Sequence, residues 1–182
     1  MAAEAAAFGL DLRLGFELTP SAALLEEDPG RYRLGGLGAV LMELPFHGDL
    51  STALALAENI ERAGLTPIIA HPERAEAVLG SPACAHALSE RGWPLQVNAT
   101  SLLGYHGRPE EAVAWLLLEQ GLAEVVASDG HRTERPPFLD QVFAIVRGRL
   151  GAGAIALFDG TAIPRVAKNR AEISLPEAGK ES

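Results

Sequence analysis

Short apolar runs alternate with longer segments of helical periodicity along most of the chain. The runs that predict strands cover residues 11–16, 39–44, 66–70, 95–98 and 124–127. The segments that predict helices cover residues 2–8, 50–63, 82–91, 110–120, 138–150, 152–157 and 163–169. Strands that alternate with helices of roughly 10–14 residues form parallel β-α units. Most of the strand-like runs are apolar at consecutive positions, as in sheets covered on both faces, so the pattern predicts an α/β fold with a parallel sheet.

Polar residues suited to metal binding or phosphate chemistry come directly after several of these runs. The positions just past a predicted strand are Glu17, His71, Asn98, Asp129 and His131. In parallel α/β folds the functional side chains gather at the carboxyl ends of the strands. Strand-end loops do not by default carry so many such residues, so the pattern is typical of the active site of a β/α barrel.

The segment Ser128-Asp129-Gly130-His131 is the clearest local signal. In an extended chain, residues i and i+2 point to the same side, which places a carboxylate beside an imidazole. Oxygen and imidazole nitrogen together are the ligands that a divalent ion of the Zn, Mn or Fe type accepts. The alternative is a simple turn, since Asp-Gly is a strong turn former, but a turn leaves His131 unexplained.

Composition narrows the classes of protein to which the chain can belong. With 182 residues, of which 48% are apolar and 21% charged, it is expected to fold as one globular domain. The formal net charge of -9 argues against binding to nucleic acid or to anionic membranes. No stretch approaches the roughly 20 apolar residues of a membrane span, so membrane insertion is not expected.

The chain has a single cysteine, Cys84, within a predicted helix. One cysteine excludes an internal disulfide and fits a reducing, cytoplasmic location. A cysteine-dependent phosphatase needs a thiolate held in a glycine-rich anion-binding loop that ends in arginine. No such loop follows Cys84, so this mechanism is excluded.

Three motifs occur in a fixed order with fitting spacing: Ile69–Arg74, Gln96–Gly104, and Ala127–His131 followed by Arg135–Pro137. Together they resemble the PHP (polymerase and histidinol phosphatase) superfamily of metal-dependent phosphoesterases. More closely, they resemble the bacterial capsular-polysaccharide protein-tyrosine phosphatases of the CpsB/CapC type. The upstream segments 14–17 and 40–45 also fit, so the resemblance covers roughly residues 12–169.

The resemblance implies a distorted (β/α)7 barrel with a site for three metal ions. The family begins with a strand that carries an Asp-x-His-x-His motif, and this chain has no His-x-His sequence. The barrel is therefore expected to be incomplete at the N-terminus, with its first one or two β-α units missing. Residues 1–170 are expected to form a single PHP-like domain, equivalent to the C-terminal two-thirds of the family's domain, and residues 171–182 a flexible tail.

The resemblance also implies the metal ligands, which are Glu17, His71, Asp129 and His131. Glu17 matches a glutamate that bridges metals, since a carboxylate has two oxygens and can hold two cations. The alternative for Glu17 is an ordinary surface glutamate after a strand. The alternative for His71 is a histidine packed at a strand end and bonded to a backbone carbonyl.

Arg74 and Arg135 resemble the family's phosphate-binding arginines and are the implied catalytic residues. A guanidinium offers a rigid fork of donors that suits phosphate oxygens; the alternative is a pair of solvated surface arginines. Asn98 either donates a hydrogen bond near the site or ties down its own loop, and both remain open. The remaining polar candidates are expected to lack a ligand role: Glu43 and Glu73, which are structural or support the site, and His47, His86 and His106.

The implied function is a metal-dependent phosphatase that removes phosphate from tyrosine in a protein by means of metal-activated water. The implied partner is a bacterial tyrosine kinase that controls polysaccharide export, and the implied metal is Mn²⁺, with Zn²⁺ or Fe²⁺ as alternatives. The location is expected to be cytoplasmic, and an oligomer is compatible with the family. Two other functions stay open: a truncated, catalytically impaired PHP-like domain, and a PHP-type phosphatase for a small molecule such as histidinol phosphate.

Overall fold

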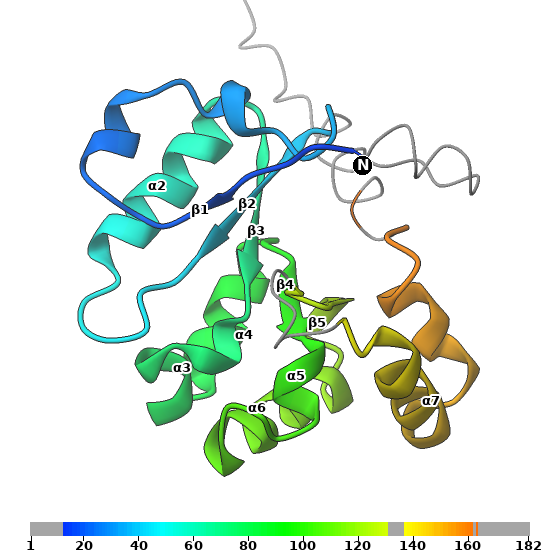
Figure 1. Ribbon diagram of the computed structural model, residues 1–182. Helices are drawn as coiled ribbons and strands as arrows, with labels where there is room; N and C mark the ends of the chain where they lie inside the picture. Colours follow the sequence, from blue (N-terminus) through cyan, green and yellow to red (C-terminus); the bar gives the residue numbers. More distant parts are fainter. Residues whose placement is uncertain (1–12, 131–136, 162, 164–182) are drawn as a thin grey trace, which may run out of the picture.

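Five parallel strands form one sheet whose spatial order follows the sequence, β1-β2-β3-β4-β5 (Figure 1). The computed structural model describes residues 13–130, 137–161 and 163. The strands are β1 (Glu17–Leu18), β2 (Ala39–Glu43), β3 (Thr66–Ala70), β4 (Leu95–Asn98) and β5 (Ala123–Ala127). Since every neighbouring pair is parallel, each strand is joined to the next by a crossover that carries helix.

The helices lie in these crossovers and after the last strand (Figure 1). The α-helices are α2 (Ser51–Arg62), α3 (Glu76–Gly80), α4 (Ala83–Glu90), α5 (Ala99–Leu102), α6 (Arg108–Glu119) and α7 (Leu139–Leu150). The 3₁₀ segments are η1 (Ala23–Glu26), η2 (Pro29–Tyr32), η3 (Pro72–Arg74) and η4 (Ala152–Leu157). Within the described part of the chain, no helix has the length and apolar character required to cross a bilayer.

The core lies between the sheet and its helices. Every residue of β3 and of β4 is buried. This explains why residues 67–70 of β3 form a continuous apolar run, whereas in β4 the polar residues Gln96 and Asn98 are buried as well. Helix α2 buries Ala53, Leu56, Ala57 and Ile60, a spacing that places all four on one face of the helix. The interior is therefore held mainly by aliphatic packing around the central strands.

The α/β class and most predicted elements are confirmed. The strands expected at 39–44, 66–70, 95–98 and 124–127 are present within one residue at either end. The helices expected at 50–63, 82–91, 110–120 and 138–150 correspond to α2, α4, α6 and α7, and residues 152–157 form a 3₁₀ segment. The expected helix at 2–8 and tail at 171–182 lie outside the described residues, as does the expected helix at 163–169 apart from residue 163.

The strand predicted at residues 11–16 is wrong over the part that the structure describes. Residues 13–16 do not pair in the sheet, and the strand β1 occupies Glu17–Leu18 instead. The alternation that suggested a strand does not separate a buried from a solvated face, because Leu14 and Phe16 are both exposed. The carbonyl of Leu14 instead accepts a hydrogen bond from the amide of Gly35, in the loop before β2, at 2.8 Å.

Strand register brings acidic side chains of β1 and β2 to one face of the sheet. Glu17 pairs with Leu41, and Glu43 lies two residues beyond Leu41, on the same side of its strand. Glu43 in turn pairs with Ala70, the last residue of β3. The next residue after Ala70 is His71, so three strand segments deliver polar groups to the same edge.

Candidate metal centre

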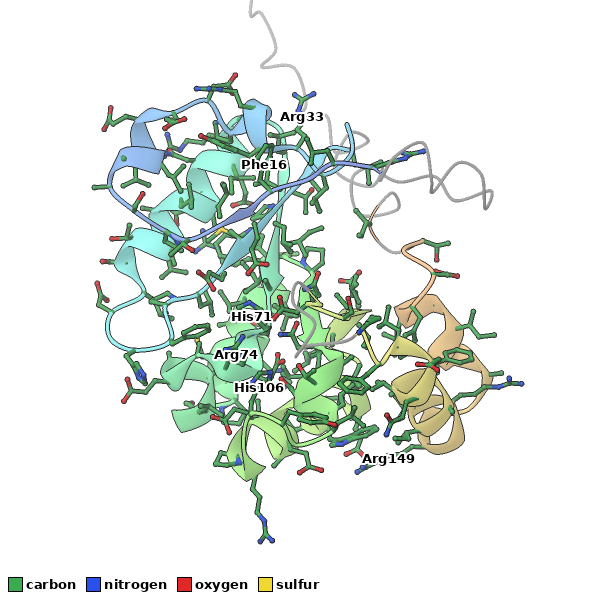
Figure 2. The ribbon with its side chains drawn as sticks, viewed as in Figure 1. Phe16, Arg33, His71, Arg74, His106 and Arg149 are labelled. Carbon is green, nitrogen blue, oxygen red and sulfur yellow. The ribbon has the colours of Figure 1, made fainter. Side chains whose placement is uncertain are left out.

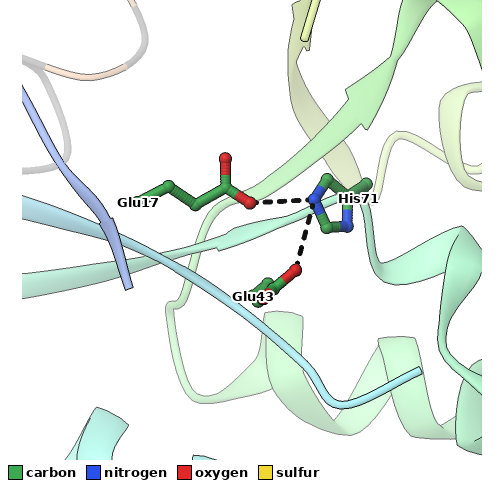
Figure 3. Close-up of side chains that lie close together, drawn as sticks. All are labelled: Glu17, Glu43 and His71. Atoms are coloured by element: carbon green, nitrogen blue, oxygen red, sulfur yellow. Dashed lines mark hydrogen bonds and ion pairs between the residues drawn. The ribbon is translucent and has the colours of Figure 1, made fainter. Parts of the chain in front are cut away.

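Glu17, Glu43 and His71 meet at this edge of the sheet (Figure 3). The Nε2 atom of His71 lies 2.9 Å from Oε1 of Glu17 and 3.8 Å from Oε2 of Glu43. One ligand atom from each of the three residues lies within 4.8 Å of the others. Two carboxylate oxygens with one imidazole nitrogen match the donor set of Zn²⁺, Mn²⁺ or Fe²⁺. The residues present therefore fit a divalent metal ion.

The backbone at His71 is held in a left-handed conformation, with φ 33° and ψ 53°. Such a conformation is uncommon for a residue with a Cβ and carries a strain of order 1–3 kcal/mol. Hydrogen bonds stabilise it on both sides: the His71 amide donates to the carbonyl of Gln96 at 2.7 Å, and the His71 carbonyl accepts from the amide of Arg74 at 3.0 Å. The turn directs a buried imidazole toward the two carboxylates, as Figure 3 shows.

Two opposing influences act on the pKa of His71. Burial of the ring is the larger single influence and lowers the pKa. The hydrogen bond and the charge of Glu17, together with the charge of Glu73, outweigh burial, so the pKa of His71 lies above its ordinary value. The neighbouring carboxylates thus favour a positive charge at this position, which is the sign of charge that a bound cation supplies.

Asp129 approaches the same cavity from the loop after β5. It too has a left-handed backbone, with φ 48°, and its side chain is 15% exposed. Its Oδ2 accepts a hydrogen bond from Nδ2 of Asn98 at 2.9 Å and lies 3.7 Å from Nη1 of Arg74. Asp129 is therefore anchored by a side chain at the end of β4 and faces the arginine of η3.

A cavity of about 610 Å³ joins these groups. Its lining includes Glu17, Glu43, His71, Arg74 and Asp129, together with Phe46 and Leu41. Its volume is in the range of small-ligand sites.

Arg74 brings a positive charge into this acidic cavity. Its guanidinium carbon lies 4.5 Å from the centre of the Phe46 ring, a contact that orients the cation by its interaction with the ring face. Figure 2 shows Arg74 beside His71 at the middle of the molecule, whereas Arg33 lies near the opposite end of the sheet. The cavity therefore combines acidic metal-type ligands with an oriented guanidinium.

Glu73, between His71 and Arg74, is completely buried and is not among the residues that line the cavity. Its Oε1 accepts a hydrogen bond from the backbone amide of Asn98 at 3.0 Å. Burial raises the pKa of this carboxyl, and the hydroxyl of Ser101 and the amide of Asn98 act in the opposite direction. Glu73 thus links η3 to the end of β4, which agrees with the supporting role expected for it.

The structure brings four of the predicted site residues to one cavity: Glu17, His71, Arg74 and Asp129. His131 and Arg135 lie outside the described residues. Of the two roles left open for Asn98, the hydrogen bond to Asp129 places it near the site. The other described histidines contact residues elsewhere: His47 lies 3.6 Å from the carboxylate of Glu76, and hydrogen bonds join His86 to Gln120 and His106 to Thr100.

Glu43 is the residue that sequence reasoning underestimated. The sequence predicts a structural or supporting role for Glu43, but its carboxylate belongs to the group that could hold a metal. It is the last residue of β2, so its strand-end position was a usable signal. Because it lies within the apolar run rather than just past it, its face could not be assigned without the register.

Comparisons with known proteins show the family to which the chain is similar. The family model described as capsular polysaccharide synthesis, CpsB/CapC, matches residues 1–158. The chain is 33% identical to the tyrosine-protein phosphatase YwqE of Bacillus subtilis over 102 residues, which cover 56% of this chain and 40% of the relative. It is 30% identical over 139 residues to the putative tyrosine-protein phosphatase CapC of Staphylococcus aureus, covering 74% of this chain and 54% of the relative.

The chain is also similar to a third curated relative and to a solved structure. The tyrosine-protein phosphatase CpsB of Streptococcus pneumoniae is 30% identical over 118 residues, which cover 62% of this chain and 49% of the relative. The chain therefore spans about half the length of the curated relatives that it matches. A chain from the crystal structures of YwqE and CpsB, described as unique metal-dependent tyrosine phosphatases, superposes with a TM-score of 0.77 at 24% identity, covering 90% of this chain and 69% of that one. At this identity the likeness establishes a shared fold.

Proposed function

The chain belongs to the CpsB/CapC family of capsular polysaccharide synthesis, and from this we propose that it is a metal-dependent phosphatase that acts on phosphotyrosine in a protein. The observation that carries the proposal is the meeting of Glu17, Glu43 and His71 in a cavity that also holds Asp129 and Arg74. Acidic and imidazole ligands beside a guanidinium suit both a divalent metal and the phosphate that it would polarise. The curated relatives are themselves named as tyrosine-protein phosphatases.

Four described residues are proposed as the metal ligands: Glu17, Glu43, His71 and Asp129. His131, two residues beyond Asp129, is proposed as a further ligand on the basis of the sequence alone. A bound divalent ion, for which Mn²⁺ is the first candidate and Zn²⁺ or Fe²⁺ the alternatives, would act as a Lewis acid and lower the pKa of a bound water. Nε2 of His71 and Oε1 of Glu17 lie 2.9 Å apart, so the two side chains are close enough to bind the same ion.

The remaining cavity residues are proposed to bind the substrate. Arg74 would donate hydrogen bonds to phosphate oxygens and offset the charge that they carry in the transition state. The Phe46 ring supports the guanidinium of Arg74 from one side and, together with Leu41, gives the cavity an apolar wall for an aromatic ring. Arg135 is proposed as a second phosphate-binding arginine from the sequence motif.

Cys84 supports a mechanism without a thiolate nucleophile. It lies in α4 and is not among the residues that line the cavity. Burial raises the pKa of its thiol, which disfavours the thiolate that a cysteine-dependent phosphatase needs. The proposed route therefore does not involve Cys84; a metal held by Glu17, Glu43, His71 and Asp129 would supply the activated water instead.

Further expectations from the family stay proposals. The sequential, all-parallel order of the five strands is the order found in β/α barrels, and this supports a distorted (β/α)7 barrel rather than a doubly wound sheet. Residues 1–170 are proposed as one domain. A cytoplasmic location, and a bacterial tyrosine kinase of polysaccharide export as the substrate protein, are proposed on the same family basis.

The direct test is hydrolysis of p-nitrophenyl phosphate with and without Mn²⁺. We expect turnover that requires the metal and is abolished by a chelator. Asp129→Ala should lower kcat/KM by about 100-fold or more, because loss of a metal ligand misplaces the reacting atoms. The matched control is Asp140→Ala, which removes an exposed carboxylate at the start of α7 and should leave the rate unchanged.

Two outcomes would redirect the proposal. Mn²⁺ binding without any turnover would favour a catalytically impaired domain. Faster hydrolysis of histidinol phosphate than of a phosphotyrosyl peptide would favour a small-molecule phosphatase. A rate that is independent of metal and insensitive to Asp129→Ala would contradict metal-dependent chemistry altogether.

A further inference from the structure

The Asn98 side chain is completely buried at the end of β4. Its Nδ2 donates to Oδ2 of Asp129 at 2.9 Å, and because a carboxylate only accepts hydrogen bonds, this contact determines which way the amide faces. Its Oδ1 is buried and has no hydrogen-bond partner among the described residues. A buried acceptor without a partner is costly, so among the described residues the bond to Asp129 is the side-chain contact that offsets this cost.

The contacts of Asn98 belong to a closed ring that joins three strand ends. Oε1 of the buried Glu73 accepts from the backbone amide of Asn98 at 3.0 Å. The Asn98 side chain then donates to Asp129, and Asp129 faces Nη1 of Arg74 at 3.7 Å. Glu73 and Arg74 are neighbours in η3, so the ring starts and ends on the segment that follows His71.

Asp129 needs such support because of where it lies. It follows β5 in a loop, has a left-handed backbone with φ 48° and is followed by a glycine. A carboxylate on such a loop presents its two oxygens in a plane that the backbone alone does not determine. The amide of Asn98 engages Oδ2 and thereby sets that plane, as the groups behind metal ligands do.

We propose that Asn98 is a positioning residue that orients the Asp129 carboxylate for metal binding, and that Glu73 anchors Asn98. The inference rests on the proposed function, because it takes Asp129 as a ligand. It deepens that function by assigning a role to two buried side chains of the motifs around His71 and Asn98. Neither of them lines the cavity.

The test is Mn²⁺ binding to the full chain, measured by isothermal titration calorimetry. Asn98→Ala should raise the Kd by about 10–100-fold, the range typical for loss of a group that orients a ligand. The matched control is Asn59→Ala, since Nδ2 of Asn59 also donates one hydrogen bond, to the carbonyl of Leu25 at 2.9 Å, but Asn59 does not line the cavity. Asn59→Ala also loses the hydrogen bond that Oδ1 of Asn59 accepts from Arg62. Each variant therefore loses at least one amide hydrogen bond and should lower Tm, whereas only Asn98→Ala should change the Kd.

Two further variants sharpen the test. Asn98→Leu keeps nearly the same side-chain shape without the donor, and should raise the Kd for Mn²⁺ as Asn98→Ala does. Glu73→Ala removes the anchor and should change the Kd in the same direction. A wild-type Kd in folded Asn98→Ala and Asn98→Leu would overturn the inference, and so would the failure of both variants to fold, because the amide would then serve the fold. Absence of Mn²⁺ binding by the unmodified chain would instead overturn the proposed function.

Discussion

Glu43 shows how one residue changes the chemistry that the site can perform. Glu17 and His71 alone offer two ligand atoms, and the carboxylate of Glu43 adds a third within 4.8 Å of both. The hydroxyl of Thr19 also donates to Oε1 of Glu43, which leaves Oε2 as the oxygen nearest to His71. The side chain is thus oriented from one side and directed at the imidazole from the other.

Glu43→Gln is expected to weaken Mn²⁺ binding. The substitution keeps the size of the side chain but removes its charge, so the Kd should rise by roughly tenfold or more. Isothermal titration calorimetry measures the change. Glu58→Gln is the matched control, because Glu58 pairs with Arg91 at 2.7 Å on the surface and does not line the cavity. An unchanged Kd in Glu43→Gln would show that Glu43 serves only to hold Thr19.

At the scale of single elements, strand β3 contains a proline, Pro67, although it is the central strand of the sheet. Proline has no amide hydrogen to donate and is normally confined to the edge of a sheet. In β3 the amide of Thr66 donates to Gly38 on the β2 side, and that of Ile69 donates to Pro94 on the β4 side. The backbone nitrogen of Pro67 lies on the β4 side of the strand, as the amide of Ile69 does. Pairing with β4 begins only at Ile69. Because β4 does not pair with β3 at Pro67, the missing amide hydrogen of this proline leaves no carbonyl of β4 without its donor.

The junction before α6 offers a sharp test of local conformation. Gly107 has φ 127° and ψ 165°, a region open essentially to glycine alone, so Gly107→Ala should destabilise the protein by about 1–3 kcal/mol. The matched control is Gly148→Ala, inside α7 and on the surface, where an added Cβ meets nothing within 4 Å. That change should stabilise by about 0.5–1 kcal/mol, since alanine is the better helix former. Denaturant unfolding measures both, and equal effects would contradict the conformational argument.

At the scale of the whole molecule, the sheet order accounts for the site. The five strands are parallel and follow one another in space as they do in sequence. Their carboxyl ends therefore lie along one edge, and the segments that follow β2, β3 and β5 deliver Phe46, His71 and Asp129 to the same cavity. This edge concentrates negative charge in a chain whose formal net charge is already -9.

Divalent metal is therefore expected to stabilise the folded chain. A ligand that binds only the native state at 100 times its Kd stabilises by about 2.7 kcal/mol, which corresponds to a rise in Tm of about 5–11 °C for a chain of this size. Differential scanning calorimetry with and without Mn²⁺ measures the shift. His71→Ala should abolish it, whereas His86→Ala, at an exposed histidine bonded to Gln120, should keep it. An equal shift in both variants would point to non-specific binding.

The sequence by itself determined the class of fold and the order of its elements. The period of the apolar positions is a property of neighbouring residues, so the central strands and the helices α2, α4, α6 and α7 could be predicted closely. The ordered motifs and the upstream segment 14–17 likewise indicate Glu17, His71, Arg74 and Asp129 as site residues. The strand at 11–16 failed because its alternation does not reflect burial.

Only the tertiary structure decided which of these side chains share a cavity and what holds them there. The face that Glu43 presents depends on the pairing of Glu17 with Leu41, since a shift of one residue would turn its side chain to the other face of the sheet. The hydrogen bond from Asn98 to Asp129 spans two strand ends separated by 31 positions in the sequence. Such contacts depend on register and on the paths of the crossovers, which are set by the packing of the whole sheet rather than by any local pattern.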